Sequence, residues 1–136
     1  MRSYDVRMFE SLDYLYIPTS DVDGVTRTYV EQLGAELVFK VRGMGTTVAC
    51  VRLSQAGPAL LLTGHLEGPE PVAVYRVTDY ASALEALRQA GATDIHQLEI
   101  PQGPCASMRA HGGLRLAIYE LVRPGVIESF TGRVDD

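Results

Sequence analysis

The sequence has 136 residues, of which 46% are hydrophobic and 21% charged, and its formal net charge is −5. This length accommodates one hydrophobic core and is too short for two independent domains, so we expect a single domain over 1–136. The negative charge and the lack of a Lys/Arg run argue against a nucleic-acid or membrane-surface partner. No apolar segment has the length of a signal peptide or a membrane span, which favours a cytoplasmic protein.

The first half of the chain has the pattern of a strand, a helix and three further strands. A run of aliphatic and aromatic residues ends at Pro18, which is typical of a strand and its exit. Asp21, or one of the two hydroxyl residues before it, can cap the helix that follows, and Gly34 ends that helix. The expected elements are a strand at 12–17, a helix at 22–33 and strands at 36–41, 46–53 and 59–63.

The same order repeats after a Gly- and Pro-rich stretch at 64–71, which has the composition of a linker. Asp79 is the expected helix cap, and Gly91 ends the second helix. Moving the second half back by 58 positions places Asp79 on Asp21 and Val72 on Tyr14. The expected elements are a strand at 72–77, a helix from 80 and strands at 95–100, 105–110 and 114–122.

This internal repeat predicts an α+β fold of two βαβββ modules. Module one covers about 10–66, module two about 70–123, and 124–136 form a C-terminal tail. Neither module alone can bury both faces of its strands, so we expect one face to pack on the helix. The opposite faces of the two modules should then meet and enclose a ligand groove.

Three segments carry a resemblance to a known family: LDYLYIPTSD at 12–21, YVEQLGAELVF at 29–39 and GLRLAIYEL at 113–121. In this order they resemble the vicinal oxygen chelate superfamily, which includes glyoxalase I, extradiol dioxygenases, methylmalonyl-CoA epimerase and bleomycin-resistance proteins. The resemblance covers nearly the whole chain. It implies a cupped mixed sheet around a ligand cavity, the glyoxalase/bleomycin resistance/dioxygenase fold, usually within a homodimer.

The resemblance also implies four metal-ligand positions, and this sequence departs from the family there. Metal-dependent members place His, Gln or Glu on the first and last strands of each module. The corresponding residues here are Tyr14, Leu61, Val72 and Ala117. Valine, leucine and alanine have no atom that coordinates a metal. We therefore expect no metal and no other cofactor at these positions.

Strand alternation predicts which side chains line the cavity instead, because residues two apart share one face of a sheet. The mixture of aromatic rings, small apolar groups and guanidinium groups suits an aromatic or anionic organic molecule. Glu120 falls on the helix side by the same alternation and is not counted as catalytic. The predicted ligand-binding residues are Tyr14, Tyr16, Leu61, Val74, Arg76, Arg115, Ala117 and Tyr119.

The histidines offer an alternative: a metal site displaced from the four family positions. His65 lies beside Glu67 and Glu70 in the linker, and these three could hold a metal, although surface carboxylates are common in such a segment. His96 lies in an expected strand. His111 lies in an expected turn, and either could carry a proton if it reached the cavity. Cys50 and Cys105 lack the spacing of a zinc site or a disulfide framework, so we expect ordinary buried thiols.

Two functions follow from these observations. The first is a metal-free small-molecule-binding protein of the glyoxalase/bleomycin-resistance type. The second is a lyase, isomerase or dioxygenase of the same superfamily, with displaced metal ligands or with metal-independent acid/base chemistry, for which Tyr14 or Tyr119 could serve. The tail should bury Val126, Ile127 and Phe130 against its own domain or a twofold partner, and we favour the partner in a homodimer.

Overall fold

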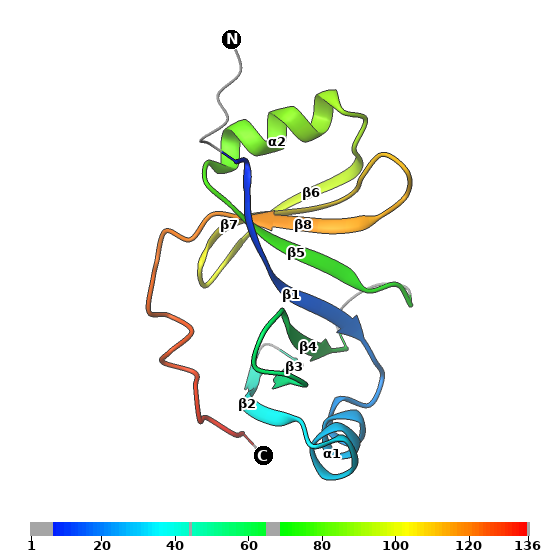
Figure 1. The fold of residues 1–136 in the computed structure, drawn as a ribbon, viewed down its shortest axis with the longest axis vertical. Coiled ribbons are helices and arrows are strands. Elements are labelled where there is room, and N and C mark those ends of the chain that lie inside the picture. The colour runs from blue at the N-terminus through cyan, green and yellow to red at the C-terminus, as the bar shows by residue number, and fades with distance from the viewer. Residues whose placement is uncertain (1–6, 44, 65–68, 136) are drawn as a thin grey trace. The chain divides into compact units, whose positions relative to one another are not determined.

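The computed structural model describes residues 7–43, 45–64 and 69–135. These residues form eight strands and two helices in an open mixed sheet (Figure 1). The predicted α+β class and the βαβββ order of both halves are confirmed. Neither helix in the described part of the chain has the length and apolar character needed to cross a membrane.

The chain divides into two compact units, each containing one helix. The α1 unit consists of 13–72 together with the tail segment 125–135, and the α2 unit consists of 7–12 and 73–124. The first strand contributes to both units, since its residues 9–12 fall in the α2 unit and the remainder in the α1 unit.

The α1 unit has the strand order β2-β3-β4-β1. β4 is parallel to β1 and antiparallel to β3, which is antiparallel to β2. The Asp21 carboxylate accepts a hydrogen bond from the Gly24 N–H at 3.0 Å, and Gly34 has a φ of 74°, so the predicted cap and end of α1 are confirmed. The elements are β1 (Phe9–Pro18), α1 (Val22–Leu33), β2 (Glu36–Gly43), β3 (Thr46–Arg52) and β4 (Ala59–Thr63).

The α2 unit repeats this arrangement in the order β5-β8-β7-β6. β5 and β8 are parallel, and the other two pairs are antiparallel. The Asp79 carboxylate caps α2 by accepting the Ser82 N–H at 3.0 Å, as its alignment with Asp21 predicts. The elements are β5 (Val72–Val77), α2 (Tyr80–Gln89), β6 (Thr93–Ile100), β7 (Gly103–Arg109) and β8 (Arg115–Tyr119).

The largest differences from the predicted strand boundaries lie at the start of β1 and at the end of β8. β1 begins at Phe9, not at residue 12, because the Phe9 ring packs edge-on against Tyr75 with centroids 5.1 Å apart. β8 ends at Tyr119, not at residue 122, although the Val122 N–H still donates to the Gln102 carbonyl oxygen at 3.0 Å and continues the contact with the chain before β7.

Each unit has a core between its helix and one sheet face. In the α1 unit, Leu62 is fully buried against α1 together with Val22 and Val51. In the α2 unit, Ile118 is fully buried against α2 together with Leu84. The opposite face of each sheet, here called the back face, carries the alternate residues of the same strands.

Candidate functional site

The strand registers of the two units make the four predicted metal positions equivalent. Leu61 on β4 pairs with Tyr16, and Ala117 on β8 pairs with Val74. Tyr14 precedes Tyr16 by two residues, so Tyr14 and Leu61 lie on one face of the sheet in the α1 unit. Val72 precedes Val74 by two residues, so Val72 and Ala117 likewise lie on one face.

The residues at these positions do not fit a divalent metal. Leu61, Val72 and Ala117 are 6%, 3% and 4% exposed, and their side chains are hydrocarbon. Tyr14 alone has a side-chain oxygen, and octahedral sites need several converging donors. These four side chains therefore cannot form the ligand set of a divalent metal.

The described residues contain no group of three or more His, Cys, Asp or Glu side chains placed to hold a metal ion. His111 is exposed in the turn before β8, and His96 is exposed on β6. His65 and Glu67, which the sequence offered for a displaced site, lie outside the described residues.

The back face of the α1 unit is aromatic. Tyr14 and Tyr16 are half-buried there and pack on a cluster of Phe39, Cys50 and Leu61. Burial raises the pKa of the Cys50 thiol to about 11, so this thiol is protonated and unreactive near neutral pH. This face can offer ring surface to a ligand.

The C-terminal tail also packs on this back face, which corrects the expectation that it docks on a twofold partner. Ile127 and Phe130 contact the cluster of Phe39, Cys50 and Leu61, and Phe130 lies 5.6 Å from Phe39 between ring centroids. The tail therefore covers its own unit, because apolar side chains in a chain end are buried most directly on the nearest apolar face. The homodimer remains a prediction, and docking of the tail on a partner no longer supports it.

Asp135 gives the attachment of the tail a dependence on pH. Hydrogen bonds from the Arg133 guanidinium and from the Arg42 N–H lower the pKa of Asp135 from 3.8 to about 2. Since the pKa is lower in the folded chain, this stabilising contribution is complete above about pH 4 and is lost as the pH falls toward 2. An NMR titration of the Arg42 amide should have its midpoint near 2, and Asp135→Asn should remove the transition. A midpoint near 3.8 would contradict this assignment.

The back face of the α2 unit combines an aromatic ring with cationic side chains. Tyr119 is 2% exposed and pairs with Arg76 across β5 and β8. The Arg76 Nε lies 3.6 Å from Glu10 Oε1, so this guanidinium has a carboxylate partner within its own unit. Arg115 pairs with Arg109 at the end of the β7–β8 ladder and is half-buried.

Glu120 has a structural role on the helix side, where alternation places it. Its Oε1 accepts the Tyr80 N–H at the start of α2, at 2.8 Å. The Tyr80 hydroxyl donates to Gln97 Oε1 at 2.9 Å, and burial raises the pKa of Tyr80. A carboxylate at a helix N-terminus is stabilised by the free N–H groups there, which accounts for Glu120 without a catalytic role.

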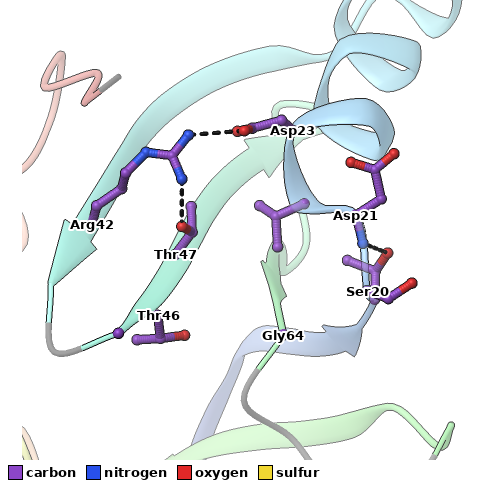
Figure 2. Close-up of a pocket in the computed structure, with 10 residues that line it drawn as sticks. Ser20, Asp21, Asp23, Arg42, Thr46, Thr47 and Gly64 are labelled. Carbon is purple, nitrogen blue, oxygen red and sulfur yellow. Dashed lines mark hydrogen bonds and ion pairs between the residues drawn. The ribbon is translucent and has the colours of Figure 1, made fainter.

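A polar cavity of about 320 Å³ opens at the N-terminus of α1, and the sequence did not indicate it. Figure 2 shows Arg42 of β2 reaching Asp23 on α1 and Thr47 on β3, at 2.8 and 2.7 Å. Arg42 and Lys40 donate to Asp23 and lower its pKa. These residues come from three elements and share no sequence motif, so only the fold brings them together. The lining is Thr19–Asp23, Arg42, Gly45–Thr47 and Gly64.

A groove of about 460 Å³ lies between α1 and β2, beside this cavity. Val30 and Leu37 form its apolar wall, and Thr26 is 6% exposed with no hydrogen-bond partner for its hydroxyl. Leaving a buried hydroxyl unpaired costs roughly 1–3 kcal/mol, so this oxygen is a place for a water molecule or a polar ligand atom.

The Cys105 thiol belongs to the α2 unit and is also buried. Its burial raises its pKa to about 12. Both cysteines are free in the structure, which confirms the expectation of ordinary buried thiols.

No protein-family model and no curated protein matches this sequence. Solved structures do match. Methylmalonyl-CoA epimerase from Mycobacterium tuberculosis aligns with a TM-score of 0.68 at 17% identity, over 90% of this chain and 94% of that chain. This chain shares the fold of that epimerase.

Two further solved structures share this fold. A Streptomyces coelicolor methylmalonyl-CoA epimerase variant in complex with 2-nitronate-propionyl-CoA has a TM-score of 0.66 and 12% identity, over 85% of this chain and 99% of that chain. A variant of 4-hydroxymandelate synthase from the same organism has a TM-score of 0.66 and 14% identity, over 87% of this chain and 40% of that chain. The resemblance seen in the sequence is thus confirmed at the level of the fold.

Proposed function

We propose that this chain binds a small organic molecule, aromatic or anionic, on the back faces of its sheet without a metal at the four family positions. The observation that carries the proposal is the buried hydrocarbon at Leu61, Val72 and Ala117. Within the α1 unit, the half-buried ring of Tyr14 packs on the cluster that contains Leu61. Such a surface excludes metal ligands and favours ring contacts.

The chemistry of the two back faces supports this ligand class. Tyr14 and Tyr16 in the α1 unit offer ring surface for stacking. Arg76 and Arg115 in the α2 unit offer guanidinium groups, which bind carboxylates and other oxyanions through paired N–H donors. The epimerase structure with 2-nitronate-propionyl-CoA is an example of an organic ligand on this fold. The proposed contact residues are Tyr14, Tyr16, Leu61, Val74, Arg76, Arg115, Ala117 and Tyr119.

Fluorescence titration with anilinonaphthalene sulfonate tests this proposal, because the probe is both aromatic and anionic. Tyr14→Ala and Arg115→Ala should each weaken its binding by roughly tenfold, as expected for the loss of one central contact. Arg88→Ala, on α2, removes the same charge on the helix side and should leave the affinity unchanged. Unchanged affinity in both folded test variants would show that the back faces are not the binding surface.

A further inference from the structure

The C-terminal segment 125–135 lies where the proposed ligand would bind in the α1 unit. Within this segment the Phe130 N–H donates to the Ile127 carbonyl oxygen at 3.0 Å, which forms a turn between them. Both side chains pack on the same cluster, and Phe130 stands next to Phe39 with a 48° angle between the ring planes. A phenyl ring of the chain itself thus occupies the aromatic back face.

Backbone hydrogen bonds hold the end of this segment along the outer edge of β2. The Lys40 N–H donates to the Arg133 carbonyl oxygen, and the Asp135 N–H donates to the Lys40 carbonyl oxygen, both at 2.8 Å. The Arg42 N–H also donates to Asp135 Oδ2, at 2.9 Å. In Figure 1 the tail runs in orange and red to the C-terminus. These bonds form one short parallel bridge and not a full strand pairing.

The segment is less firmly attached than the cluster it covers. Phe39 and Cys50 are 4% and 3% exposed, whereas Ile127 and Phe130 are only half-buried and most other tail residues are exposed. Segments with few buried apolar contacts open locally at a much lower free-energy cost than global unfolding. The tail can therefore leave the face while the sheet beneath it stays folded.

We propose that the C-terminal segment is an internal occupant of the back face of the α1 unit, and that a ligand with a benzene-sized ring binds there by displacing Phe130 from Phe39. This inference rests on the proposed function above. It adds the position at which an aromatic ring of the ligand binds, and the competition of segment 125–135 for that position. Because ligand and tail compete for one surface, the measured affinity is the intrinsic affinity reduced by the fraction of open molecules.

Cys50 is a natural reporter of this opening, since its thiol lies in the cluster beneath the tail. Cys105 belongs to the α2 unit, so a Cys105→Ala background leaves one thiol to measure. In that background, Phe130→Ala should raise the rate at which dithiobis(nitrobenzoate) modifies Cys50 by roughly tenfold. Asp135→Ala, which removes the acceptor of the Arg42 N–H, should raise it by a smaller factor and serves if Phe130→Ala does not fold.

Two matched variants separate tail opening from general loosening. Val126→Ala shortens a half-buried tail side chain outside the cluster and should leave the rate unchanged. Ile118→Val destabilises the core of the α2 unit and should also leave it unchanged. An unchanged rate in Phe130→Ala and Asp135→Ala, or an equal rise in Ile118→Val, would overturn the proposal.

Titration of the same variants with anilinonaphthalene sulfonate distinguishes failure of this inference from failure of the proposed function. Tighter probe binding in Phe130→Ala, by roughly tenfold, together with weaker binding in Tyr14→Ala supports both. If Tyr14→Ala weakens binding and Phe130→Ala does not change it, the competition is wrong and the proposed function stands. If neither variant changes the affinity, the back face of the α1 unit binds no such ligand and this inference is wrong. The proposed function is then also wrong if Arg115→Ala leaves the affinity unchanged.

Discussion

Replacing Gly103 with alanine is expected to lower the free energy of unfolding by about 2 to 3 kcal/mol. A Cβ at this position would lie 2.1 Å from the Glu120 carbonyl oxygen and 3.0 Å from Val122 Cγ2. Since the first of these atoms is backbone, β7 and the exit of β8 would have to separate. That movement would stretch the hydrogen bond from the Glu120 N–H to the Pro104 carbonyl oxygen, now 3.1 Å.

Gly43→Ala is the matched control for this change. Gly43 ends β2, and a Cβ there would meet no atom within 4 Å. Its effect on the unfolding free energy should stay within about 0.5 kcal/mol. Chemical denaturation of both variants measures the difference. Equal effects would mean that the contact between Gly103 and Glu120 does not exist in solution.

Leu62→Ala should remove about 2 to 5 kcal/mol of stability. Leu62 is 0% exposed and packs beneath α1 with Val22, Ala49 and Val51. The loss has two contributions: the hydrophobic transfer free energy of the deleted side-chain atoms, and the cost of the cavity that remains in the core.

The comparison for Leu62 is Leu33→Ala. Leu33 ends α1 and is 60% exposed, so its truncation should change stability by no more than about 0.5 kcal/mol. Thermal or denaturant unfolding measures both variants. An equal decrease in the free energy of unfolding for both variants would mean that Leu62 is not part of the buried core beneath α1.

Local patterns in the sequence predicted most elements of this fold. Helix caps and strand alternation depend on neighbouring residues, which is why Gly34 and Asp79 could be assigned correctly and Asp21 was among three candidates for the first cap. The start of β1 at Phe9 was not assigned, because the Phe9 ring packs against Tyr75, which lies far along the chain and leaves no local signal. The end of β8 was placed three residues beyond Tyr119, because the apolar pattern continues past the strand.

The candidate site was less predictable than the fold. Alternation predicted correctly that Tyr14 and Tyr16 share one face, because it depends only on strand geometry. The family resemblance supplied Leu61, which packs in the same cluster. The polar cavity around Arg42 was missed, and the docking of Phe130 on its own unit was only the less favoured of two alternatives. Both join residues from separate elements, and neither leaves a spacing signal in the sequence.

Ligand binding without a metal at Tyr14, Leu61, Val72 and Ala117 is tested most directly by chelation. The affinity of the full chain for anilinonaphthalene sulfonate is measured before and after exhaustive dialysis against EDTA. The hydrocarbon side chains at Leu61, Val72 and Ala117 predict the same affinity in both samples. Loss of binding on chelation, with recovery on adding Mn²⁺ or Zn²⁺, would contradict the account.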